Sequence, residues 1–276
     1  PTKIAGLTIS PDDLGSKIGF AGIRFLVAGI LVTILAIIQK RKFKVEQKSV
    51  VAWLLLFALV NTALHYLFSY VGLGYLPSSR STILDSMNGF FAIILSCIIF
   101  EDDKFSKFKA LGCILGFSGI LLINIEPGQN FFQGISFRGD GMILLNAMCG
   151  AFGGIITRII SKKMDMTVAT SLSMTIGGTF LCVVSAIIGP AARWTITTES
   201  IIIMIGLILI SAVCFGVYNQ LLAYHPISKI AIFNAFIPIL GVIFSSIILG
   251  EPMRVKYIIA GCIVALGVYV MNHFSK

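Results

Sequence analysis

Nine long apolar segments constrain this sequence more than any other feature. They cover residues 18–39, 50–71, 78–100, 108–125, 139–160, 166–188, 200–222, 227–249 and 256–274. A helix needs about 20 apolar residues to cross the hydrocarbon core of a bilayer, and lipid excludes open sheet edges. Only 12% of the 276 residues are charged, whereas soluble domains have about 25%. We therefore predict an all-α membrane protein without room for a sizeable soluble domain.

Residues 1–9 are too short to cross a bilayer. We predict that they are the C-terminal part of a first helix, truncated at the N-terminus of this chain. The nine complete segments then form the second to tenth helices of a ten-helix bundle. The expected location is the plasma (cytoplasmic) membrane of a prokaryotic cell.

The basic residues set the orientation of the chain. If successive gaps lie on alternate sides, one side collects 13 of the 21 Lys and Arg residues, including Lys40-Arg41-Lys42. Basic residues mark the cytoplasmic side, so the C-terminus is predicted to be cytoplasmic. The net charge of +9 then follows from topology, and no nucleic-acid partner is expected.

The sequence repeats itself at an offset of 149 residues. Tyr75 aligns with Tyr224, and Gly112-Cys113-Ile114 aligns with Gly261-Cys262-Ile263. The offset spans five helices, so the second half enters the membrane in the opposite orientation, as is common in secondary transporters. Gly112-x3-Gly116 and Gly261-x3-Ala265 predict close helix packing. The predicted organisation is two inverted five-helix repeats, residues 1–125 and 139–276, joined by a connecting loop at 126–138.

Two further motifs resemble a known family. Asn234-Ala235-Phe236-Ile237-Pro238 precedes Leu249-Gly250-Glu251-Pro252 and then Gly261. This pattern resembles the EamA-type helix pair of the drug/metabolite transporter superfamily. Phe20-Ala21-Gly22-Ile23-Arg24-Phe25 is similar to the Arg-Phe signature of the family's second helix. The resemblance implies ten helices, a central cavity, transport of amino acids, other metabolites or drugs, and no ATP-hydrolysing part.

The first half departs from this pattern. Gly89 aligns with Pro238, and Phe100-Glu101-Asp102 replaces the Leu-Gly-Glu element. Arg24 of the family signature is expected to hold backbone carbonyls or lipid headgroups rather than substrate.

We interpret the chain as a secondary transporter of a small amino-acid-like or drug-like metabolite. It would work by alternating access, with proton coupling as one option. The alternative is a non-transporting membrane receptor or assembly subunit. An enzyme is not expected, because no HExxH or GxSxG motif occurs. The six cysteines lack metal-ligand spacing, so neither a metal nor a cofactor is predicted. The expected partners are a small-molecule substrate and membrane lipid, for a monomer or a homodimer.

Asp85 is the strongest candidate site residue, because ionisable groups inside membrane spans are costly and invite a functional interpretation. Its repeat partner is Asn234, and Asn88 shares its helix face. Asp85 either contacts a substrate amine, carries a coupling proton, or forms a structural ion pair, for example with Lys3. Lys3 itself either meets a substrate carboxylate or extends to the headgroups.

A polar stripe marks the segment at 50–71. Asn61 and His65 lie on one helical face, and Tyr66 follows with a ring that suits a cationic ligand. The stripe either lines a cavity or forms hydrogen bonds between helices. The same two interpretations apply to Asn146, Tyr218 and Asn219.

Overall fold

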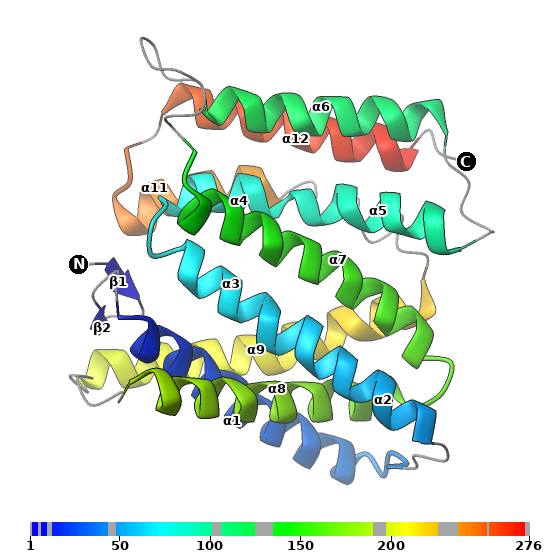
Figure 1. Ribbon diagram of the computed structural model, residues 1–276. Helices are drawn as coiled ribbons and strands as arrows, with labels where there is room; N and C mark the ends of the chain where they lie inside the picture. Colours follow the sequence, from blue (N-terminus) through cyan, green and yellow to red (C-terminus); the bar gives the residue numbers. More distant parts are fainter. Residues whose placement is uncertain are drawn as a thin grey trace. The chain divides into compact units, whose positions relative to one another are not determined.

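Helices make up nearly all of the structure (Figure 1). The computed structural model describes residues 2–4, 7–9, 13–43, 48–100, 106–124, 135–189, 197–225, 237–252 and 254–273. The π-helical segments are η1 and η3, and the others are α-helices. In chain order they are α1 (Leu14–Ile38), α2 (Lys48–Phe57), η1 (Ala58–Leu64), α3 (His65–Gly72), α4 (Ser78–Asp85), α5 (Met87–Ile99), α6 (Lys107–Asn124), η3 (Phe137–Gly141), α7 (Met142–Ile160), α8 (Met166–Ile188), α9 (Thr198–Tyr224), α11 (Ile237–Leu249) and α12 (Val255–His273).

The helix bounds follow the predicted apolar segments closely. Within the described ranges, six helical stretches are long and apolar enough to cross a membrane, and two apolar helices, Ile237–Leu249 and Val255–Val270, are shorter. The first ten residues of the predicted segment 227–249 lie outside the described residues. A helical membrane protein is therefore confirmed.

The prediction for residues 1–9 is wrong where the structure describes them. Strands β1 (Thr2–Ile4) and β2 (Leu7–Ile9) pair antiparallel, with Lys3 opposite Thr8. The sequence has a physical reason for this outcome. The β-branched residues of these strands lose rotamer freedom in a helix and pack well in strands.

The chain divides into two compact units that do not follow sequence order. The first unit combines residues 1–74 with 156–224, and the second combines residues 75–155 with 225–276. The first unit therefore holds α1, α2–η1–α3, α8 and α9. The second holds α4, α5, α6, most of α7, α11 and α12. Each unit takes helices from both halves of the chain, and the predicted division into inverted repeats stays a prediction.

Glycines bring α1 and α8 of the first unit into close contact. Gly15, Gly22 and Gly29 recur every seven residues on α1. A Cβ atom added to Gly22 would lie 2.7 Å from the backbone nitrogen of Cys182, and one added to Gly29 would lie 2.5 Å from that of Thr175. Both distances are shorter than real Cβ contacts, so this face of α1 admits only glycine and holds the rest of the helix in a fixed position.

The second unit has a similar close contact between α6 and α12. A Cβ atom added to Gly267 would lie 2.8 Å from the carbonyl oxygen of Gly112 and 3.1 Å from the nitrogen of Gly116. The predicted close packing at Gly112 and Gly116 is thus confirmed. Its partner is Gly267 rather than Gly261, whose added Cβ atom would lie at an ordinary 3.6 Å from Pro238. The 149-residue offset did not reveal which face of α12 packs on α6.

Candidate functional site

Asp85 lies where a membrane-spanning helical stretch is interrupted. Helix α4 ends at Asp85 and α5 begins at Met87, within the apolar stretch Ser78–Ile99. The Ser86 hydroxyl donates to the Thr82 carbonyl at 2.8 Å, and the Gly89 N–H donates to the Ser86 carbonyl at 3.2 Å. Hydroxyl bonds of this kind to the preceding turn often bend a helix. The local sequence thus places the carboxylate of Asp85 at a break in the helix.

Asn146 is the partner of this carboxylate within the second unit. Its side chain is 3% exposed on α7, and its Nδ2 donates to Asp85 Oδ1 at 2.5 Å. The ion pairs that the structure describes, Arg41–Asp165 and Arg80–Asp140, do not include Asp85. The side chain of Lys3 lies outside the described residues. In the described part of the chain, the hydrogen-bond partner of the Asp85 carboxylate is therefore an amide rather than a cation.

A second irregularity contains the polar stripe of the first unit. Asn61 lies inside the π-helical segment η1, and His65 begins α3 directly after it. The Tyr66 ring packs 4.0 Å from Phe25 and 5.8 Å from Phe215, between centroids, and the His65 ring lies edge-on at 4.8 Å. Both Asn61 and His65 are half-buried. Tyr66 is therefore part of an aromatic cluster formed by α1, α3 and α9.

Arg24 lies at the edge of that aromatic cluster. Its Nε donates to Ser211 Oγ at 2.7 Å and its Nη1 donates to the Tyr70 hydroxyl at 3.1 Å. The guanidinium carbon lies 5.0 Å from the centroid of Phe25 and 5.8 Å from that of Tyr66, both within the range of a cation–π contact. These contacts go to side chains, whereas the sequence led us to expect backbone carbonyls or headgroups. Arg24 thus ties α1 to α3 and α9.

Asn219 forms hydrogen bonds between helices. It is 2% exposed on α9, and its Nδ2 donates to Thr170 Oγ1 on α8 at 3.1 Å. One residue later, Gln220 Nε2 donates to Thr167 Oγ1 at 2.7 Å. These contacts favour the helix-pairing interpretation of Asn219 over the cavity interpretation.

Three candidate residues remain: Tyr218, Asn88 and Asn234. Tyr218 is 37% exposed on α9, and Asn88 is half-buried in the first turn of α5. Asn234 lies outside the described residues, so its predicted relation to Asp85 stays a prediction. No group of three metal-ligating side chains occurs among residues that the structure describes.

Sequence reasoning missed the hydroxyl partners. Ser211 binds Arg24, and Thr170 binds Asn219. The sequence does contain a signal for Ser211 as a candidate site residue, because it is the only hydroxyl-bearing residue between Ile201 and Val217. A lone hydroxyl in an apolar run usually bonds its own helix, and Ser211 does also donate to the Leu207 carbonyl.

The described residues form a multi-pass helical membrane protein whose buried polar side chains pair inside apolar spans. The model of the EamA-like transporter family matches residues 7–125 and 137–273, so the chain belongs to this family. Membership confirms the resemblance seen in the sequence. It also confirms that the protein is not an enzyme, and it implies a small-molecule substrate.

Several known proteins are similar to this chain over most of its length. "Uncharacterized transporter YvbV" of Bacillus subtilis (strain 168) is 27% identical over 280 residues, which cover 100% of this chain and 87% of that protein. "WAT1-related protein At3g02690, chloroplastic" of Arabidopsis thaliana is 25% identical, over 91% of this chain and 62% of that protein. A crystal structure with 11% identity covers 98% of this chain and 90% of its own, at a TM-score of 0.70. At that identity the match shows the fold alone.

Proposed function

We propose that this protein is a secondary transporter that moves a small amino-acid-like or drug-like metabolite across the plasma membrane by alternating access. Its helices would form two inverted repeats, with the C-terminus in the cytoplasm. Family membership supports transport. One structural observation supports the site: both candidate polar regions coincide with irregular helix, Asn61 with η1 and Asp85 with the α4–α5 break.

Irregular helix inside a membrane is informative because lipid does not satisfy free backbone groups. Non-helical backbone is tolerated there only where protein or a water-filled cavity takes over those groups, and at the α4–α5 break the Ser86 hydroxyl binds the Thr82 carbonyl. π-Helical segments also occur frequently at functional sites, and discontinuous helices form the substrate sites of many secondary transporters. Asn61, His65, Asp85 and Asn88 are therefore our candidates for substrate contact.

Each compact unit is suited to act as one rigid body during alternating access. A rocking mechanism needs rigid bodies that each keep their internal packing. In the first unit the glycine contacts of Gly22 and Gly29 fix α1 on α8. In the second, Gly267 fixes α12 on α6. Each unit therefore has the internal packing that a rigid body requires.

Asp85 is the proposed coupling group. Its carboxylate is the acidic group of the apolar stretch Ser78–Ile99, and its Asn146 partner carries no charge. A neutral partner lets the carboxylate gain and lose a proton without leaving a buried cation behind. A proton that binds Asp85 from one side and leaves to the other would couple substrate movement to the proton gradient.

Uptake into proteoliposomes tests this function. The full chain is reconstituted and given a panel of labelled amino acids and cationic drugs, with and without an imposed pH gradient. We expect gradient-driven uptake of at least one compound, which Asp85→Asn uncouples from the gradient. Glu199→Gln is the matched control, because Glu199 is an exposed carboxylate in the first turn of α9. An unchanged gradient dependence in Asp85→Asn rejects the coupling role, and no uptake of any compound contradicts transport.

A further inference from the structure

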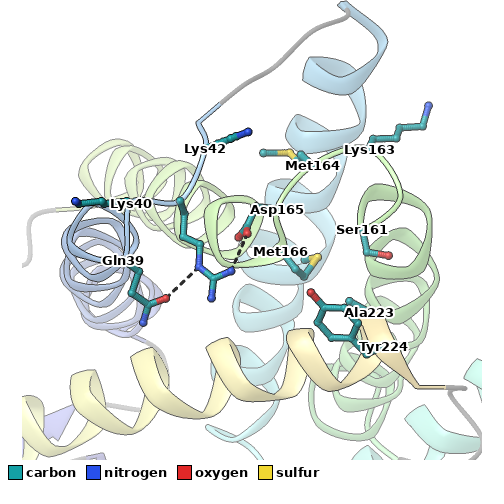
Figure 2. A pocket seen from close by; sticks show the side chains of 11 residues that line it. Gln39, Lys40, Lys42, Ser161, Lys163, Met164, Asp165, Met166, Ala223 and Tyr224 are labelled. Carbon is teal, nitrogen blue, oxygen red and sulfur yellow. Dashed lines mark hydrogen bonds and ion pairs between the residues drawn. The ribbon is translucent and has the colours of Figure 1, made fainter.

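The first unit contains a polar pocket that the transport proposal does not use. Its volume is about 750 Å³. Three segments form it: the end of α1, the connection between α7 and α8, and the end of α9 (Figure 2). All three belong to the side of the chain that collects the basic residues. The pocket is therefore expected at the cytoplasmic surface of the membrane.

The pocket carries an excess of positive charge. Lys40, Arg41, Lys42 and Lys163 line it, against the single carboxylate of Asp165. In the view of Figure 2, Lys40 and Lys163 lie at opposite edges of the pocket. The ion pairs that the structure describes include none of the three lysines. The pocket is thus suited to an anion.

Asp165 is already engaged and does not neutralise these cations. Its Oδ1 accepts the N–H groups of Thr167 at 2.8 Å and Val168 at 3.4 Å, so it caps the N-terminus of α8. Its Oδ2 lies 3.4 Å from Arg41 Nη1. Arg41 in turn donates from Nε to Gln39 Oε1 at 3.2 Å. Three lysine ammonium groups therefore remain for a ligand.

The backbone at the end of α1 turns the basic cluster into the pocket. Lys40 has φ 54°, a left-handed conformation that is unfavourable for a residue with a Cβ atom. The Lys40 N–H donates to Ile37 O and the Arg41 N–H donates to Ala36 O, both at 2.9 Å. This is the helix-ending motif in which glycine usually occupies the left-handed position. A lysine there brings an extra cation to the pocket at a conformational cost.

The surface beside the pocket is apolar and indicates the source of the anion. On the last turns of α1, Ile34 is 48% exposed, Ile37 is 60% exposed and Ile38 is 70% exposed. In a membrane these side chains contact acyl chains just below the headgroup level, where the lysines begin. We propose that the pocket binds the phosphate headgroup of an anionic phospholipid from the cytoplasmic leaflet, with its acyl chains along α1.

Direct binding to the purified full chain tests this proposal. A short-chain phosphatidylglycerol is titrated and the bound complex is measured by native mass spectrometry, with phosphatidylcholine as the neutral comparison. Each basic residue near an anionic headgroup contributes about fivefold in affinity. The double variant Lys42→Gln/Lys163→Gln is therefore expected to weaken phosphatidylglycerol binding by about 25-fold.

A charge-matched double variant separates the pocket from general attraction. Lys107→Gln/Lys162→Gln removes the same charge from exposed positions outside the pocket, and Lys162 adjoins Lys163. This control should change affinity by less than about twofold. An equal loss in both double variants would show diffuse attraction and overturn the pocket.

Competition distinguishes lipid from soluble phosphate. Inorganic phosphate and glycerol phosphate are added to the preformed phosphatidylglycerol complex. Displacement by either at concentrations comparable with the lipid would show a site for free phosphate and reject the lipid assignment. Because no transport substrate is present, failure of lipid binding leaves the proposed transport function untouched.

Discussion

The carboxylate of Glu251 caps the N-terminus of α4 by binding Ser79. Its Oε2 accepts the Ser79 N–H at 3.1 Å and the Ser79 hydroxyl at 2.8 Å, and its Oε1 accepts the Ser78 N–H at 2.7 Å. The first N–H groups of a helix have no partner within the helix, and the helix dipole favours an anion there. Gly250, with φ 66°, ends α11 just before this glutamate. The Leu-Gly-Glu element of the family therefore joins two helices of the second unit.

Loss of this cap should destabilise the protein. Glu251→Ala removes three hydrogen bonds to α4 and is expected to lower the free energy of unfolding by about 2 kcal/mol. Glu251→Gln, which keeps an acceptor oxygen but not the charge, should have an intermediate effect. Thermal denaturation of the purified protein in detergent measures both. Glu199→Ala is the control, and an equal melting temperature for Glu251→Ala and Glu199→Ala would contradict the capping role.

The contact between α1 and α8 should not tolerate a single methyl group. Gly22→Ala places a Cβ atom 2.7 Å from Cys182 N, and overpacking of this kind costs about 1–3 kcal/mol. Gly206→Ala on α9 has nothing within 4 Å of the added atom, so higher helix propensity should stabilise it by up to about 1 kcal/mol. Opposite shifts in melting temperature are therefore expected. Two shifts of the same sign would refute the close approach.

Arg80 and Asp140 form a buried ion pair in the second unit. Arg80 Nη2 lies 2.6 Å from Asp140 Oδ1, and the two side chains are 14% and 4% exposed. Arg80→Met leaves a buried carboxylate without its cation, which typically costs about 3–5 kcal/mol. Adding Asp140→Asn removes that charge and keeps an acceptor for the Ser136 N–H, 2.9 Å away in the native protein. The double variant should regain most of the lost stability, as measured by denaturation. No recovery would argue against the ion pair.

Arg24 should depend on its planar guanidinium rather than on its charge alone. A lysine ammonium in Arg24→Lys cannot bind Ser211 and Tyr70 at once, as two nitrogens of the guanidinium do. The loss of hydrogen bonds from a charged donor is expected to lower the free energy of unfolding by about 1.5–3 kcal/mol. Tyr70→Phe removes only one of the two bonds and should cost less. Thermal denaturation of the two variants compares these losses. Wild-type stability in Arg24→Lys would show that charge alone suffices.

The helical spans were predictable because lipid leaves few options. Apolar runs long enough to cross a membrane must be helical, and the observed ends, such as Leu14–Ile38 and Met166–Ile188, lie within a few residues of the predicted ones. The hairpin at Thr2–Ile4 and Leu7–Ile9 was not predictable in this way, since short segments depend on local strand preference. The family was also predictable, because the motifs that contain Arg24 and Leu249-Gly250-Glu251 are short stretches of neighbouring residues.

The partners of the polar residues were not predictable. Asp85 was recognised from its cost inside a span, yet its contact with Asn146 joins residues 61 positions apart. The roles of Arg24 and Asn219 depended likewise on Ser211 and Thr170, which lie on other helices. No periodicity within one helix reports which neighbour packs against it.

The sequence by itself determined that the chain is a helical membrane protein, because hydrophobicity and span length are properties of each segment alone. Only the tertiary structure decided that Glu251 caps α4, that glycines fix α1 on α8, and that four basic residues enclose a pocket around Asp165. These contacts join distant parts of the chain. They depend on how helices pack within each unit, which the order of residues along a single helix does not specify.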